Sequence, residues 1–148
     1  MTRKSLLVMV PALLALTLPF SSCENDKDPD KFNTLNFEAP LSARNMIPAS
    51  SSSATGSFTG KYNKATRVLS YTVTTQGVTP TYIRIYRGAP GTIGPQEFVL
   101  SNSGNLTLTP AQENDLIFRN YYVQVGSANN PAGEIRGNIM QNRANPIE

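Results

Sequence analysis

Tyrosine and arginine alternate in the stretch YIRIYR that begins at Tyr82. In a β-strand alternate side chains share one face, so Tyr82, Arg84 and Tyr86 form one polar row while the isoleucines between them face a core. An arginine between tyrosines can stack on aromatic rings and bind a carboxylate or sulfate group. With Arg87 at its margin and Gln124 from a later strand, this row is the candidate ligand surface. The alternative is that it forms an ordinary solvent-facing side of a sheet.

Catalytic chemistry has little support in the remaining residues. The chain contains no histidine, so a serine or cysteine nucleophile lacks its usual base. The three glycines of residues 88–94 lie among prolines and have no helix or lysine placed for phosphate, which predicts a turn. Glu134 and Arg136 are two apart on a predicted strand and are expected to have structural roles. We therefore expect no enzymatic activity, no catalytic residue, no metal ligand and no cofactor.

The first 22 residues have the layout of a secretory signal peptide: Arg3 and Lys4, an apolar run, and small residues before Cys23. The run is too short and too interrupted by prolines to span a membrane stably. Cys23 is the only cysteine, and residues 20–23 resemble the bacterial lipoprotein signal, although phenylalanine stands where an aliphatic residue is usual. We expect a lipid on Cys23 to anchor the exported protein to the membrane. An ordinary signal peptide followed by an incidental thiol is the alternative.

Residues 23–31 are predicted to form a tether, because they are acidic and contain a proline but hardly any apolar side chain. The chain has 13 basic and 10 acidic residues, and removal of Arg3 and Lys4 with the signal leaves the two kinds nearly balanced. A balanced charge gives no reason to expect a nucleic-acid partner. The predicted location is the bacterial cell envelope, at the outer membrane or cell surface, with an envelope glycan or protein as partner.

Short stretches with strand periodicity follow, separated by turn residues. One helix is expected over residues 110–119, because Thr109, Pro110 and Gln112 form the signature of a capping box. A loop is predicted at residues 42–55 and a polar tail at 141–148. The expected strands cover residues 32–41, 55–62, 68–74, 82–87, 97–100, 106–108, 121–125 and 134–140. The pattern predicts one all-β domain, 32–140, folded as an antiparallel Greek-key β-sandwich with one short helix; a barrel is the alternative.

The chain resembles the CHRD domain, a module first described in chordin and common in bacterial secreted proteins. The resemblance extends over about residues 32–140. Its most specific parts are RGAPG and NPAGEIRG, in this order and behind a lipoprotein-like signal. The matching segments are FEAPLS at 37–42, SATG at 53–56, LSYTV at 69–73, RGAPG at 87–91, LTLTPAQ at 106–112, YVQV at 122–125 and NPAGEIRG at 130–137.

This resemblance implies an immunoglobulin-like or superoxide-dismutase-like sandwich outside the cell. It also implies that this chain differs from its relatives at one site. Relatives usually carry histidines at the positions of Arg84, Tyr86 and Gly126, in an arrangement typical of copper or zinc ligands. Arginine stays protonated and glycine has no side chain, so these positions cannot ligate a cation in the same way. Our first hypothesis is a lipid-anchored binding or structural module without catalysis. The alternative is a degenerate metal-binding or redox domain that has lost its histidine ligands.

Overall fold

The computed structural model describes residues 33–142. The predicted signal peptide (1–22), the lipid site at Cys23, the tether (23–31) and residues 143–148 of the predicted tail lie outside this range. The elements in chain order are β1 (Thr34–Ser42), the 3-10 helix η1 (Ala43–Asn45), β2 (Thr55–Asn63), β3 (Val68–Gln76), β4 (Tyr82–Arg87), β5 (Gln96–Leu100), β6 (Ser103–Thr107), α2 (Pro110–Ile117), β7 (Tyr121–Gly126), β8 (Ile135–Asn138) and β9 (Met140–Gln141).

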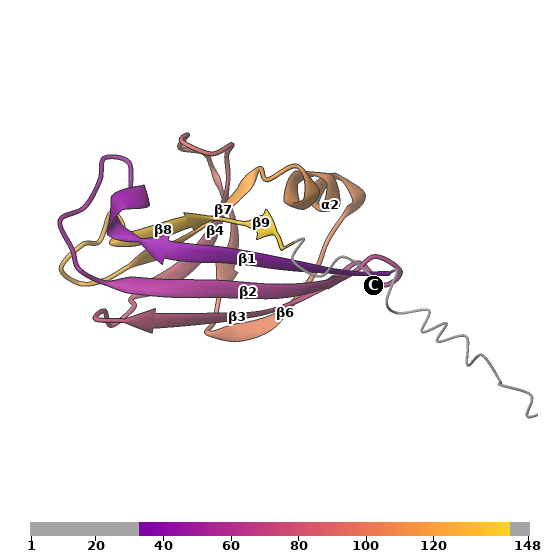
Figure 1. The fold of residues 1–148 in the computed structure, drawn as a ribbon, viewed down its shortest axis with the longest axis horizontal. Helices are drawn as coiled ribbons and strands as arrows, with labels where there is room; N and C mark the ends of the chain where they lie inside the picture. The colour runs from indigo at the N-terminus through magenta and orange to yellow at the C-terminus, as the bar shows by residue number, and fades with distance from the viewer. Residues whose placement is uncertain (1–32, 143–148) are drawn as a thin grey trace, which may run out of the picture.

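All strand pairs are antiparallel, in the order β5-β4-β7-β8-β1-β2-β3-β6, and β9 also pairs with β1. The sheet folds over so that β4, β7 and β8 lie behind β1, β2, β3 and β6, with the core between the two layers (Figure 1). The two layers are joined where β1 meets β8, through the register pair Ser42 and Arg136. The predicted all-β, antiparallel sandwich is confirmed, and consecutive strands such as β3 and β4 are not neighbours in it.

The core is formed by the inward side chains of both layers. Phe58 and Tyr62 of β2 are fully buried, as are Val123 and Val125 of β7 in the opposite layer. The alternation of Phe58 and Tyr62 with exposed residues in β2 is the period-two pattern that predicted the strands. Other buried members are Phe37, Ala39, Leu41, Leu69, Tyr71, Val73, Ile83, Ile85, Leu116, Tyr121, Ile135 and Ile139.

The hairpin of β2 and β3 confirms the strongest local prediction. The two strands pair in continuous register from Asn63 with Val68 to Thr55 with Gln76. The side-chain oxygen of Asn63 accepts hydrogen bonds from the backbone N–H groups of Ala65 and Thr66, which holds the turn.

The predicted helix is present as α2. The Thr109 hydroxyl accepts from the N–H of Gln112, and the Gln112 side chain accepts from the N–H of Thr109, so the capping box is confirmed. The helix ends at Ile117 rather than at Arg119, which has a left-handed backbone with φ of 63°. Within residues 33–142 no helix is long and apolar enough to cross a membrane.

Most strand boundaries differ from the sequence prediction by one or two residues, and three differences affect the pairing of strands. The strand expected at residues 106–108 is β6, which begins at Ser103 because it follows the edge of β3. The single strand expected at 134–140 is divided at Ile139 into β8, which pairs with β7, and β9, which pairs with β1. Gln141 and Asn142, expected in the tail, lie along β1: Gln141 pairs with Phe37, and Asn142 donates hydrogen bonds to Asn36 and Glu38.

Candidate functional site

The outer face of β4, β7 and β8 brings together most of the predicted ligand surface. β4 directs Ile83 and Ile85 into the core, where they are 4% and 1% exposed, and its other side carries the predicted polar row. The register places Gln124 of β7 opposite Arg84 and Tyr122 opposite Tyr86. On the far side of β7, Arg136 of β8 lies opposite Gln124, and Asn138 lies opposite Tyr122. We call the seven residues Tyr82, Arg84, Tyr86, Tyr122, Gln124, Arg136 and Asn138 the tyrosine-arginine face.

One end of the tyrosine-arginine face is a contact of Arg84 with Tyr82. The guanidinium carbon lies 4.3 Å from the centroid of the Tyr82 ring. The Gln124 amide donates to the Tyr82 hydroxyl at 3.0 Å and to the carbonyl of Ala132 at 2.9 Å. Burial raises the pKa of Tyr82, and the hydrogen bond from Gln124 opposes that rise. Tyr82, Arg84 and Gln124 therefore form one contact group, as the sequence predicted.

The space above Gly126 is filled by the Tyr82 ring. These two residues are register partners, and a Cβ atom at Gly126 would overlap the ring carbons. A side chain at the position where relatives are expected to carry the third histidine therefore has no room while Tyr82 keeps this conformation.

The other end of the tyrosine-arginine face is a column of three side chains. The rings of Tyr86 and Tyr122 are nearly parallel, with centroids 5.3 Å apart. The guanidinium carbon of Arg136 lies 3.4 Å from the centroid of the Tyr122 ring. Because β7 lies between β4 and β8, Tyr122 is held between the other two. Tyr122 is only 1% exposed although it points away from the core.

Residues 88–95 form a loop that covers this column. The loop is fixed to the sheet by the N–H of Gly94, which donates to the Tyr122 hydroxyl at 3.2 Å, and by the carbonyl of Thr92, which accepts from Arg136 Nη2 at 2.6 Å. The N–H of Gly88 donates to the carbonyl of Asn120. Gly91 has a φ of 81°, which favours glycine. The glycine-rich segment is the turn that the sequence predicted, and its function here is to bury Tyr122 and Arg136.

Arg136 is a buried cation without an acidic partner among residues 33–142. It is 2% exposed, and no carboxylate forms an ion pair with it in that range. Its Nε atom is buried and has no hydrogen-bond acceptor, and burial lowers its pKa from the ordinary arginine value. The Nε of Arg84 and the Nδ2 of Asn138 are likewise buried without an acceptor. The tyrosine-arginine face therefore has an excess of unpaired donors.

Arg87 does not belong to this face. It follows the alternation of Ile83 and Ile85 to the opposite side of β4, where its register partner is the buried Tyr121. There its Nη1 lies 3.9 Å from Oδ2 of Asp115 on α2. The sequence grouped Arg87 with the polar row because it is adjacent in the chain.

Glu134 has the structural role that the sequence predicted. It is 7% exposed, and it accepts a hydrogen bond from the Ser52 hydroxyl at 2.6 Å. Hydrogen bonds from Ser127 and Ser52 lower the pKa of the Glu134 carboxyl, against the opposing effect of burial. It holds the loop before β2 against the end of β7 and makes no ion pair with Arg136.

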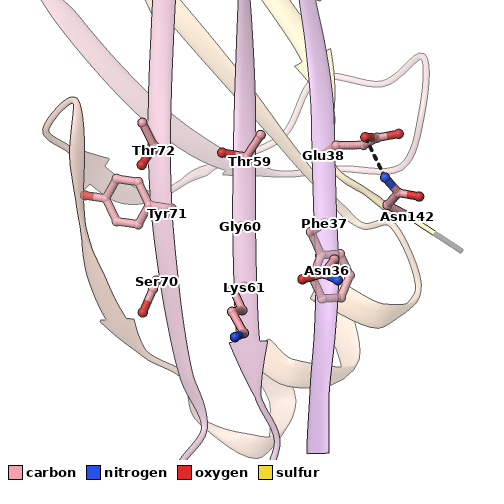
Figure 2. Close-up of a pocket in the computed structure, with 10 residues that line it drawn as sticks. All are labelled: Asn36, Phe37, Glu38, Thr59, Gly60, Lys61, Ser70, Tyr71, Thr72 and Asn142. Atoms are coloured by element: carbon pink, nitrogen blue, oxygen red, sulfur yellow. Dashed lines mark hydrogen bonds between the residues drawn. The ribbon is translucent and has the colours of Figure 1, made fainter. Parts of the chain in front are cut away.

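A hollow of about 370 Å³ lies on the outer side of β1, β2 and β3 (Figure 2). Its lining includes the side chains of Glu38, Lys61 and Thr72 on the exposed side of the three strands. The sequence analysis did not identify these residues. None of the residues lining this hollow has a buried donor or acceptor without a partner, in contrast to the tyrosine-arginine face.

Comparisons with known proteins identify one family. A model of the CHRD domain matches residues 37–139. No curated protein and no solved structure matches the chain. In the part of the chain that the structure covers, no three histidine, cysteine, aspartate or glutamate side chains gather as metal ligands would.

Proposed function

From the finding that this chain belongs to the CHRD domain family, we propose that it is a binding module of the bacterial cell envelope without catalytic activity. A lipid on Cys23 holds the domain at the outer membrane or cell surface. The tyrosine-arginine face of the sandwich binds a glycan of the envelope. A protein partner that uses the same face is the alternative outcome of the tests below.

The lack of a carboxylate partner for the Arg84 guanidinium within residues 33–142 is the observation that supports a binding function. The Arg84 guanidinium lies on the Tyr82 ring, and its Nε has no acceptor. Among the described residues it has no carboxylate partner, whereas Arg67 and Arg87 each pair with an acid. A guanidinium held against an aromatic ring can donate to hydroxyl or acidic groups of a sugar while neighbouring rings offer apolar faces to it. Tyr82 and Tyr86 supply such rings in the absence of tryptophan.

Substitution of Arg84 tests the binding function. We expect the parent protein to be retained on immobilised cell-wall or matrix glycans, and Arg84→Ala to bind at least about tenfold more weakly, because a charge-assisted hydrogen bond contributes about 1.5–3 kcal/mol. Arg87→Ala is the matched control, since it removes the same charge from the other side of β4. Equal retention of the parent and Arg84→Ala would mean that this face does not bind the glycans tested.

Substitution of Cys23 tests the lipid anchor. Residues 20–23 support it by their likeness to a lipoprotein signal, and a free exposed thiol is a liability in an exported protein. We expect cells that make the parent protein to incorporate labelled palmitate into it and to retain it in the membrane fraction. Cys23→Ser should show neither property. The anchor proposal is wrong if Cys23→Ser takes up as much label as the parent.

A further inference from the structure

A buried guanidinium without a counter-charge is unusual, because removing a charge from water is costly unless the charge is paired. Among residues 33–142, Arg136 is such a group: it contacts the Tyr122 ring and one carbonyl, and its Nε has no acceptor there. The carbonyl of Thr92 carries only a partial negative charge. The protein therefore holds a cation in place and compensates it incompletely.

Asn138 adds a second unpaired donor on the same side of β8. Its Nδ2 is buried without an acceptor, and its register partner is Tyr122. The Arg136 guanidinium lies on the ring of that same tyrosine. The Arg136 side chain thus extends to the register partner of Asn138, and both unpaired groups are N–H donors. A group that satisfied both would have to be an acceptor, and the positive charge favours an anionic one.

The loop of residues 88–95 is the cover that such a ligand would have to displace. Within residues 33–142, the Thr92 carbonyl accepts the only hydrogen bond between this loop and Arg136, and the exposed Ile93 follows directly, with 71% of its surface accessible. An oxyanion binds a guanidinium more strongly than a neutral carbonyl does, and it can accept two parallel bonds. The Thr92 carbonyl therefore occupies a position that a ligand oxygen can take over.

We propose that Arg136 and Asn138 form an oxyanion site for the acidic groups of a glycan, carboxylate or sulfate, with Tyr122 as its wall and Thr92 as its cover. The site extends across Gln124 to Arg84, which provides a second unpaired guanidinium on the same face. The proposal deepens the proposed function and rests on it in naming a glycan, but the anion site itself can be tested with small ions.

The test is an NMR titration of the folded protein with the side-chain N–H signals of arginine and asparagine resolved. Sodium sulfate and sodium glucuronate are the two probes, each exchanged against sodium chloride at constant ionic strength so that screening stays unchanged. We expect the Nε–H signal of Arg136 and the amide signals of Asn138 to shift saturably with at least one probe. The Nε–H signals of Arg67 and Arg87, which pair with acids, should stay in place. The probe that binds more tightly distinguishes a sulfated from a carboxylated ligand.

Two variants and a control locate the binding. Arg136→Lys keeps the charge but loses the planar donors, so we expect at least about tenfold weaker binding. Asn138→Ala should weaken binding by a smaller factor, and Arg87→Gln should leave it unchanged. The parent titration decides the question even if a variant does not fold. If neither anion moves the Arg136 signal, the oxyanion site is wrong.

The glycan experiment and the anion experiment test the two proposals independently, so either one can be wrong without the other. Retention of neutral and acidic glycans alike through Arg84, with no response of Arg136 to either anion, would overturn the oxyanion site and leave the binding function intact. A saturable response of Arg136 without any glycan retention would support the oxyanion site and show that the proposed glycan ligand is wrong.

Discussion

Replacing Gly94 by alanine is expected to destabilise the protein by about 3 kcal/mol or more, at the upper end of what overpacking usually costs. A Cβ atom at this position would overlap the backbone carbonyl of Arg87. No side-chain rotation can relieve that contact, because Arg87 itself is fixed by β4 and by a hydrogen bond from its N–H to the carbonyl of Pro95. The loop must therefore leave the sheet. Urea denaturation of both proteins measures the difference.

Gly91 provides the control within the same loop. A Cβ atom there meets nothing within 4 Å, but the φ of 81° is unfavourable for alanine. Gly91→Ala should cost only about 1–2 kcal/mol, the usual penalty of the left-handed region. If Gly94→Ala is no less stable than Gly91→Ala, the loop is not held against Arg87 in the way the structure describes.

Truncation of Tyr122 is expected to have an effect of similar size. Tyr122→Ala should lower the free energy of unfolding by about 3–5 kcal/mol, as for other large buried aromatic side chains. The substitution removes the ring that Tyr86 and Arg136 contact, and it leaves the Gly94 N–H without its acceptor. It also removes the one ring that shields the buried guanidinium. Thermal and urea unfolding both report the change.

Tyr122→Phe separates the ring from its hydroxyl. The ring contacts are kept and one hydrogen bond is lost, so the cost should be about 1 kcal/mol. A cost as large as that of Tyr122→Ala would show that the hydroxyl and its bond to Gly94, rather than the stacked column, hold the loop in place.

Local sequence patterns predicted most of the fold. Alternation identified the strands, Asn63 and its neighbours identified the hairpin turn, and the residues at 109–112 identified the start of the only α-helix in residues 33–142. The break at Ile139 was not predictable, because this residue is as apolar as a strand residue should be. Its N–H bonds to Tyr121 and so continues the register of β7 with β8, whereas Met140 and Gln141 beyond it pair with β1, a change of partner that no local pattern contains.

The candidate site was predicted only in part, for a related reason. Alternation within β4 is a local property, so it identified Tyr82, Arg84 and Tyr86. The same rule, applied strictly, would have placed Arg87 on the other side. Arg136 became part of the site through the register of β7 with β8 and through the cover of residues 88–95. Neither is a property of the segment that contains Arg136.

The buried guanidinium of Arg136 lies against the Tyr122 ring, under the loop of residues 88–95. Local opening of this loop would bring the charge into contact with water, and its hydration would offset part of the energy lost from broken contacts. The long hairpin of β2 and β3 has no such compensation. We therefore expect local opening of the native protein to begin at this loop, and an anion that takes over the position of the Thr92 carbonyl to make that opening more frequent.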